Sequence, residues 1–447
     1  MKFLLKLKFL FLLSVLATSL VGFSNSAHAV LKIDITEGNS DPIRVATPAF
    51  SGTDQTTSSI GKKISGVIDQ NLKRSGLFNV INKSSYIQKI AGLNTIPDFG
   101  SWKSIRAQAL IVGSVEYERS NIVKVQFRLW DALTGKQTLA KSFRASPNGW
   151  RRIAHLISDE IYNYLTGEEG YFDTRIVYIA ESGNWRRKTK RLAIMDQDGA
   201  NNMFLTSGRN LVLTPRFDPQ MQRIIYLSYR TRTPSVHLYN LSTGKEEVLG
   251  QLPGMSFAPR FSPDGKKALF SVSVRGNTDV YEMDLRSRKV RRITQNPAID
   301  TSPSYSPDMK RIVFNSDRSN GQQIYVMDTG GKRAKRISYG KGRYSTPVWS
   351  PRGDLIAFTK MSSGKFQIGV MKPDGSGERL LTESYLDEGP TWSPNGRVII
   401  FTRSTPSTST RPGTSNLYSV DITGYNLRKI DTPTEASDPA WSPVLSK

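Results

Sequence analysis

The chain has 447 residues, with 62 Lys and Arg against 38 Asp and Glu, which gives a formal net charge of +24 at pH 7. Its hydrophobic content of 38% is that of an ordinary globular protein with room for two or three domains, and nothing in the composition suggests disorder. The sequence has no cysteine, which excludes disulfide bonds and anchoring through a lipid-modified cysteine.

Residues 1–29 have the pattern of a secretory signal peptide. Lys2, Lys6 and Lys8 precede an apolar run that continues to about Phe23, and Ala27-His28-Ala29 follows as a cleavage motif. An uncleaved membrane anchor is the alternative, but the apolar run is shorter than the roughly 20 residues that a spanning helix needs. We therefore expect a mature chain that begins at Val30.

Residues 30–170 predict a small α+β domain with a mixed sheet. Alternating apolar residues predict strands over 30–38 and 42–50, and the 3.6-residue period predicts a helix from Ser59 to a stop at Gly76. Further patterns follow in chain order: strands over 77–81, 109–117, 123–130 and 137–143, and a helix over 150–165.

Residues 171–447 contain a repeat whose clearest copy is Ala258–Phe270, APRFSPDGKKALF. Six copies carry a proline about 44 residues apart, a spacing typical of four-stranded propeller blades. These prolines are Pro215, Pro259, Pro303, Pro347, Pro390 and Pro439. In each copy a strand with one aromatic ring precedes a turn related to Ser262-Pro263-Asp264-Gly265, and in the first five copies an apolar second strand follows the turn. The aromatic rings are Phe217, Phe261, Tyr305, Trp349, Trp392 and Trp441, which we expect to lie in the core between blades.

The last copy ends soon after its first strand. Residues 176–180, 192–196 and 203–206, which precede the first proline, read as the three strands that it lacks. We therefore predict an all-β six-bladed propeller in which the two ends of the domain share one blade, because such closure removes exposed sheet edges.

Chemical motifs are absent from the sequence. It has no G-x-S-x-G, H-E-x-x-H or G-x-x-x-x-G-K-[ST] pattern, so we predict no enzyme, no catalytic residue, no metal and no cofactor. His237 aligns with polar residues at the start of third blade strands and is expected on the surface. His155 is expected to contact Asp159 on the same helix face or to pack against the propeller. Asp196-Gln197-Asp198-Gly199 reads as a hairpin turn rather than a calcium loop.

Two segments and the repeats together resemble the TolB family, whose members are periplasmic components of the Tol-Pal envelope system. The segments are FRLWDALTGKQTLA at 127–140 and WRRIAHLISDEIYNYLTGEEGYFDTRIVYIA at 150–180. The resemblance implies a periplasmic adaptor that binds the outer-membrane lipoprotein Pal through the propeller and TolA through its amino-terminal region. Such an adaptor would support outer-membrane integrity and constriction during cell division.

Two sets of partner-binding residues follow. The loops that enter the first strands differ between copies although the prolines recur, so we predict a Pal-binding face there; by resemblance, Met255, Thr301 and Ser302 match Pal-contacting positions. The predicted face consists of Met255, Ser256, Phe257, Asp300, Thr301, Ser302, Arg343, Tyr344, Asp387 and Glu388. The predicted TolA segment is Val30, Leu31, Lys32, Ile33, Asp34 and Ile35, which alternate as in a strand with one apolar face. The sequence pattern alone favours a first strand of its own domain for this segment, because strand-forming termini are usually tied down, and the resemblance reverses that preference.

The positive charge lies mostly on residues 171–447, which hold 41 Lys and Arg against 25 Asp and Glu. These residues are dispersed through many loops, so a diffusely basic, solvated surface competes with an acidic partner or an acidic envelope polymer. A nucleic-acid partner is excluded by the signal peptide, and we expect a monomer without a small-molecule substrate. The alternatives from other classes are a secreted propeller hydrolase and a module that binds peptidoglycan or another glycan.

Overall fold

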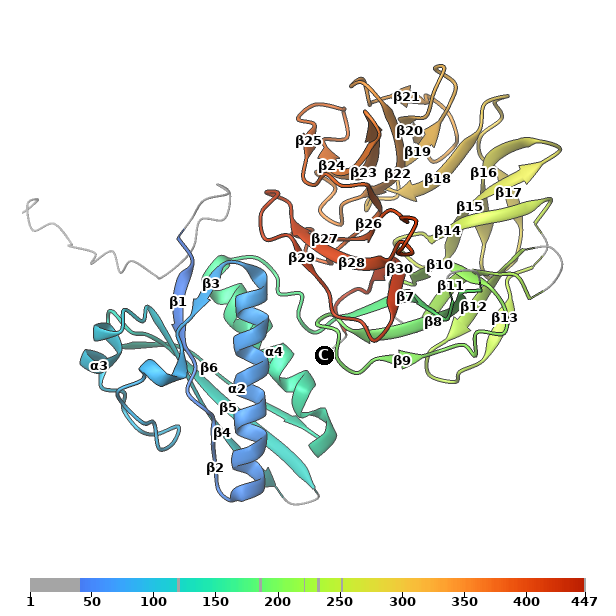
Figure 1. The fold of residues 1–447 in the computed structure, drawn as a ribbon. Helices are drawn as coiled ribbons and strands as arrows, with labels where there is room; N and C mark the ends of the chain where they lie inside the picture. The colour runs from blue at the N-terminus through green and yellow to red at the C-terminus, as the bar shows by residue number, and fades with distance from the viewer. Residues whose placement is uncertain are drawn as a thin grey trace, which may run out of the picture. The chain divides into compact units, whose positions relative to one another are not determined.

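The computed structural model describes residues 41–118, 121–184, 187–220, 222–230, 234–250 and 252–445. Within these residues a mixed α/β region is followed by six four-stranded antiparallel sheets (Figure 1). The predicted signal peptide and the predicted strand over 30–38, with the segment Val30–Ile35, lie outside the described residues. No helix in the described part of the chain is long and apolar enough to cross a bilayer.

The α/β region contains one mixed sheet with the strand order β3-β1-β4-β5-β6, and β2 pairs with β4 beside this path. Its strands are β1 (Ile43–Ala46), β2 (Ser51–Gly52), β3 (Phe78–Val80), β4 (Ala109–Glu118), β5 (Ile122–Asp131) and β6 (Lys136–Ala145). The pairs of β1 with β3 and with β4 are parallel, whereas β4, β5 and β6 form an antiparallel meander. The predicted strands over 42–50, 77–81, 109–117, 123–130 and 137–143 are confirmed within a few residues.

Helices α2 (Gln55–Ser75) and α4 (Trp150–Thr166) pack against each other, and the short α3 (Phe99–Ser104) lies between β3 and β4 in the chain. Helix α2 begins four residues before the predicted Ser59, because the side chain of Asp54 accepts a hydrogen bond from the backbone N–H of Thr57 over 2.8 Å. The hydroxyl of Thr57 in turn accepts from the backbone of Asp54, which completes a capping box. The helix ends as predicted at Gly76, whose φ of 77° suits glycine.

The six blades each have a first strand at the channel and a fourth at the outer edge. Blades 1 to 3 are β10 (Val212–Phe217), β11 (Arg223–Ser228), β12 (Ser235–Asn240), β13 (Glu246–Val248); β14 (Met255–Phe261), β15 (Lys267–Val274), β16 (Asn277–Asp284), β17 (Val290–Arg292); and β18 (Asp300–Tyr305), β19 (Arg311–Ser316), β20 (Gln323–Asp328), β21 (Lys335–Arg336). Blades 4 and 5 are β22 (Arg343–Trp349), β23 (Ile356–Ser362), β24 (Lys365–Met371), β25 (Arg379–Leu380); and β26 (Leu386–Trp392), β27 (Val398–Ser404), β28 (Ser415–Asp421), β29 (Arg428–Lys429). Blade 6 is β30 (Glu435–Trp441) with β7 (Arg175–Ser182), β8 (Thr189–Asp196) and β9 (Met203–Phe204).

Blade 6 closes the ring as predicted, because the last strand of the chain pairs with the first strand of the propeller. Strand β30, drawn in red, lies antiparallel to β7, drawn in green, with Trp441 opposite Ile176 (Figure 1). The indole Nε1–H of Trp441 also donates to the hydroxyl of Thr174 over 2.8 Å in a buried position. The closure therefore combines a strand ladder with a buried side-chain hydrogen bond.

Every first strand has a β-bulge directly before its repeat proline. The residue at the bulge has a φ between 46° and 66° in all six blades, and the ladder changes register there. The bulge residues are Thr214, Ala258, Ser302, Thr346, Gly389 and Asp438. Residues such as 255–257 and 300–301, which we predicted as loops, are therefore strand residues paired with the second strand, and this part of the prediction is wrong.

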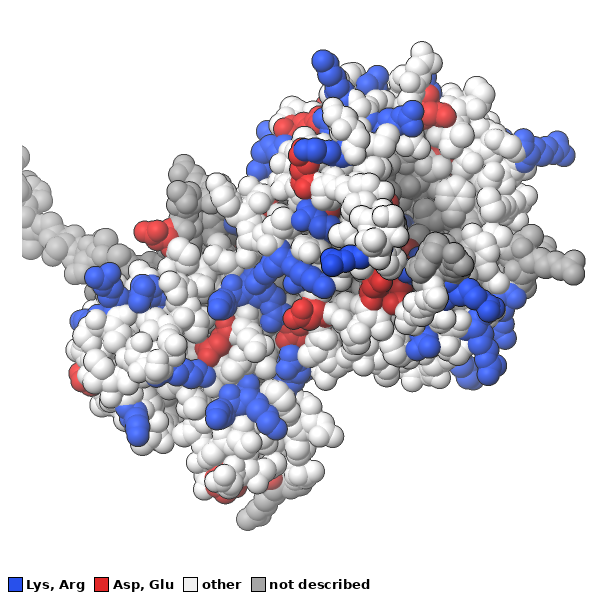
Figure 2. Space-filling view, viewed as in Figure 1, with Lys and Arg blue, Asp and Glu red and all other residues white. Residues whose placement is uncertain are grey.

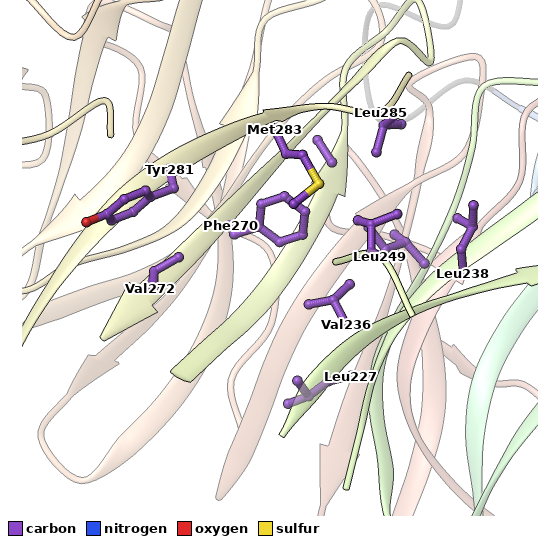
Figure 3. Close-up of a cluster of buried hydrophobic side chains, with 11 residues drawn as sticks. Leu227, Val236, Leu238, Leu249, Phe270, Val272, Tyr281, Met283 and Leu285 are labelled. Atoms are coloured by element: carbon purple, nitrogen blue, oxygen red, sulfur yellow. The ribbon is translucent and has the colours of Figure 1, made fainter. Parts of the chain in front are cut away.

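The core between neighbouring blades is formed by apolar residues of their second and third strands. Between blades 1 and 2, Leu227 and Val236 pack in one cluster with Phe270, Val272 and Met283 (Figure 3). Five of the six aromatic rings predicted for the core are buried. The sixth, Phe261, is partly buried and packs against this cluster, so the repeated aromatic position contributes to the core. Similar apolar clusters lie between blades 6 and 1, 2 and 3, 3 and 4, and 4 and 5. A blade therefore buries its apolar faces only when both neighbours are present.

Deletion of residues 438–447 removes most of β30 and leaves the edge of β7 unpaired. We expect the truncated chain to lose the single cooperative melting transition of the propeller, because blade 6 loses its first strand and both neighbours lose an interface. Differential scanning calorimetry of the truncated and full chains tests this. A control chain that lacks only residues 446–447 should melt like the full chain; equal melting of all three would contradict the closure argument.

Candidate partner-binding surface

The first strands begin at one end of the propeller, which we call the entry end, and run to the Ser-Pro-Asp-Gly turns at the other, the turn end. Among the predicted Pal-face residues, the side chain of Met255 is 51% exposed, and Arg343 and Glu388 are also exposed. Phe257, Thr301 and Ser302 are partly buried. These six residues keep accessible surface at the entry end.

The other four residues of the predicted face are buried. Asp300 and Asp387 are fully buried: Arg318 Nη2 donates to both oxygens of Asp300 at 2.9 and 2.8 Å. Arg403 holds Asp387 through two parallel bonds of 2.7 and 2.6 Å. Charges held in this way stabilise the strand ends rather than meeting a partner.

Ser256 and Tyr344 complete the buried set, and the hydroxyl of Tyr344 donates to the carboxylate of Glu378 over 2.9 Å. Neither side chain is available at the surface. No local pattern predicted this burial, because these residues precede the bulge, where the side of the strand that faces the core changes.

Thr301 and Ser302 lie at the entry end of blade 3, where the side chain of the first and the backbone of the second are already bonded. The hydroxyl of Thr301 donates to Asn315 Oδ1 over 2.8 Å, and the backbone N–H of Ser302 donates to the hydroxyl of Ser271 in blade 2 over 3.0 Å. The position of these residues is fixed by the blade and by its neighbour. A partner would therefore meet a preorganised surface.

Glu388 is an exposed acid of the predicted face, and its pKa is raised. Desolvation and the nearby charge of Asp438 raise the pKa of Glu388, while Lys190 acts in the opposite direction. The two acids lie on the first strands of neighbouring blades 5 and 6. This part of the entry end thus carries negative charge in a protein that is basic as a whole.

The structure adds exposed apolar residues at the entry end that sequence reasoning missed. They are Leu211, Tyr229, Ile299, Tyr339 and Tyr385, with exposed fractions between 40% and 67%. A signal was present, because Leu211, Met255 and Ile299 each stand four residues before a repeat proline. Apolar side chains of this size exposed at one end of a molecule are typical of a protein-binding surface.

A second cluster of polar residues joins α4 to the turn after β8. His155 Nε2 lies 3.9 Å from a carboxylate oxygen of Asp196, and Arg151 forms ion pairs with both Asp196 and Asp198. The turn itself is the predicted hairpin, because Gly199 donates to the carbonyl of Asp196 over 2.9 Å.

His155, Asp196 and Asp198 have ligand atoms within 4.8 Å of one another, a spacing that a metal ion could use. His155 Nδ1, however, accepts a hydrogen bond from Asn71 Nδ2 over 2.9 Å, and Gln197 fixes the orientation of that amide. The proton of the neutral ring therefore lies on Nε2, which leaves no lone pair toward the carboxylates. Since arginine already neutralises both acids, we assign the cluster a structural role.

The structure confirms one of the two alternatives predicted for His155, which is buried against Asp196 of the propeller strand β8, and it corrects the prediction for His237. Instead of contacting His155, Asp159 accepts hydrogen bonds from the backbone N–H groups of Phe172 and Asp173 at 2.7 and 2.9 Å. Burial nevertheless raises the pKa of Asp159 to about 7. His237 is buried rather than on the surface, and its Nε2 lies 3.1 Å from the hydroxyl of Ser235.

Basic residues are dispersed over the face of the molecule drawn in Figure 2, where Lys and Arg stand among uncharged residues and beside several acids. Many described arginines are neutralised locally, as Arg292 is by Asp279 over 2.6 Å. This favours a diffusely basic surface over a single basic stripe that would bind an acidic partner on that face.

Acidification should destabilise the fold through His155. Burial, assisted by the charges of Arg151 and Arg74 and opposed by Asp198, lowers the pKa of His155 to about 4. Between its ordinary pKa of 6.5 and that value the unfolded chain binds more protons, so the free energy of unfolding falls as the pH falls. We expect a loss of about 2 kcal/mol by pH 5 from this group. Denaturant unfolding at pH 7.5 and 5 should show that His155→Asn loses less stability than the wild type; identical losses would contradict the assignment.

The α/β region and the propeller both resemble domains of the same protein family. Residues 31–138 match the family model of the TolB amino-terminal domain, and residues 162–445 match that of the TolB beta propeller domain. The chain is 59% identical over 430 residues to the Tol-Pal system protein TolB of Pelagibacter ubique, covering 94% of this chain and 96% of the relative. It is 60% identical over 420 residues to that of Paramagnetospirillum magneticum, covering 94% of each. The crystal structure of TolB from Acinetobacter baumannii superposes with a TM-score of 0.80 at 29% identity, over 90% of this chain and 97% of that one. The chain belongs to the TolB family of Tol-Pal system proteins.

Proposed function

We propose that the protein is a non-enzymatic periplasmic adaptor that binds Pal at the entry end of its propeller and TolA through its amino-terminal segment. Membership of the TolB family supports a role among Tol-Pal components. The pattern of residues 1–29 supports export, and we propose 30–170 and 171–447 as the two domains of the mature chain. In this role the protein supports outer-membrane integrity and constriction during division.

The observation that carries the Pal proposal is the set of exposed apolar side chains at the entry end. Met255 and Ile299 are 51% and 45% exposed, and three tyrosines at this end are exposed as well. Burial of such side chains under a partner stabilises a complex by roughly 25 cal/mol per Å² of apolar surface. The strand ends beneath them are held by buried ion pairs, so little ordering is required on binding.

The three exposed tyrosines, Tyr229, Tyr339 and Tyr385, also favour a second function, glycan binding, because sugars stack on aromatic rings. A peptidoglycan-binding propeller would use the same end of the molecule. Binding to isolated peptidoglycan without Pal distinguishes the two functions. We favour Pal, since methionine, leucine and isoleucine at the same end suit a protein partner.

Placing a large charge at Thr301 should weaken Pal binding. Thr301→Arg introduces a cation at the entry end of blade 3, where the residue lies partly exposed beside the bulge. We expect at least ten-fold weaker binding to Pal in isothermal titration calorimetry, with a melting temperature within a few degrees of the wild type.

The matched control is Thr243→Arg, which adds the same charge in the exposed turn between β12 and β13, at the opposite end of the strands. It should bind Pal like the wild type. Equal affinities of the two variants would show that the entry end is not the Pal surface.

Deleting residues 30–35 should abolish binding to TolA. We expect the melting temperature to stay nearly unchanged and the Pal affinity to change only a few-fold, because a segment that packs on its own domain or on a partner couples the two binding events. Surface plasmon resonance with immobilised TolA measures the loss. As a control, Lys32→Ala with Asp34→Ala alters the polar face of the expected strand and should retain binding. Retained TolA binding by the deletion, or loss of the fold, would refute the role of the segment.

A further inference from the structure

The turn end of the propeller channel contains a cavity of about 360 Å³. It is lined by the first-strand residues that follow each bulge and by the turns after them. The six residues directly after the repeat prolines form its inner ring: Arg216, Arg260, Ser304, Val348, Thr391 and Ala440. A volume of this size suits a small organic molecule.

Two arginines stand side by side in this ring without a carboxylate partner. Arg216 and Arg260 belong to β10 and β14, the first strands of neighbouring blades, which contact each other. The side chain of Arg216 donates one hydrogen bond, to the carbonyl of Pro215 over 2.6 Å, and the side chain of Arg260 has no hydrogen bond or ion pair with any described residue. By contrast, Asp218, which also lines the cavity, is paired with Arg223 over 2.9 Å.

The positive charge of this pair is not neutralised by an ion pair with any described residue. Both side chains are partly buried and line the cavity. Burial lowers the pKa of Arg260, and the like charge of Arg216 lowers it further. Burial also lowers the pKa of Arg216, and Asp438 opposes that change without forming an ion pair. Two guanidinium groups in this setting stabilise the fold less than a pair that shares an anion.

Other ring residues add donors and apolar walls. The hydroxyl of Ser304 accepts from the backbone N–H of Trp349 over 3.4 Å, and that of Thr391 accepts from Trp441 over 3.3 Å. No described residue accepts a proton from either hydroxyl, so both protons are free to point into the cavity. The aromatic rings of neighbouring positions line the rest of the space.

We propose that the turn-end cavity binds a small organic anion whose carboxylate or phosphate group lies between Arg216 and Arg260, with its apolar part against the aromatic rings. Guanidinium groups bind such anions through paired, charge-assisted hydrogen bonds. The site lies at the opposite end of the channel from the proposed Pal surface, and it does not depend on either partner proposal. It gives the channel a ligand-binding role of its own.

The test is isothermal titration calorimetry of the full mature chain with acetate, benzoate, phosphate and phenyl phosphate at constant ionic strength set with sodium chloride. We expect benzoate or phenyl phosphate to bind at least several-fold more tightly than acetate or phosphate, because of the aromatic walls. Binding of the carboxylates alone or of the phosphates alone identifies the anion class, and binding of both supports the site equally.

Arg216→Gln and Arg260→Gln should each weaken binding at least ten-fold. The matched control is Arg288→Gln, which removes an arginine that is paired with Glu247 at the surface of the same propeller. Its affinity should equal that of the wild type. If all three variants lose affinity equally, the anion is held by the general basic charge and the site is refuted; no binding of any probe by the wild type also refutes it.

Melting temperatures in chloride show whether the variants fold. Arg260→Gln should melt no lower than the wild type, since it removes a like-charge contact. If it fails to fold, Arg260→Lys keeps the charge but loses the planar fork, and it should still weaken phosphate binding. Selenate diffused into crystals of the wild-type chain should appear between the two arginines; a selenate bound only elsewhere would overturn the proposal.

Discussion

The pairing of β30 with β7 is the interaction on which the rest of the propeller depends. A blade buries its apolar faces only between two neighbours, so an open ring leaves two such faces and two strand edges in water. Closure by the last strand of the chain removes all four at once. It also places the six first strands around one axis, which creates both the entry end and the turn-end cavity.

The bulge before each repeat proline divides the first strand into two functional halves. Before the bulge, strand residues carry the exposed Met255 and the buried, arginine-bound Asp300 and Asp387. After it, the next residues face the channel, where Arg216 and Arg260 lie. The positive φ at the bulge is unusual for residues such as Thr214 and Ala258. It is repeated in all six blades because the fold requires the side chains of the first strand to change sides there.

Most of the fold could be predicted from the sequence because its signals are local and repeated. The interval between prolines gave the blade count, and the three strands at 176–206 gave the shared blade. The limits of α2 show what was harder, since its start depends on a capping box at Asp54 rather than on the apolar period. The boundary near residue 170 stays a prediction.

The candidate site was predictable only in part, because burial at the entry end depends on partners distant in the sequence. Arg318 and Arg403 stand 18 and 16 residues after the acids that they hold; Arg318 follows β19 and Arg403 lies on β27. Nothing in the local pattern distinguished the buried Asp387 from the exposed Glu388. His237 was misplaced for a similar reason, because a polar residue at a strand start was assumed to face water.

Sharing one blade between the two ends of the propeller has a consequence for how the protein is made. Strand β7 emerges from the ribosome long before β30, so its inner edge stays without its partner until almost the whole chain has been synthesised. An unpaired strand edge is a template for wrong pairing, with another copy or with another blade. Until β30 is available, this edge of the propeller stays open to such wrong pairing, and the pairing of β30 with β7 closes it.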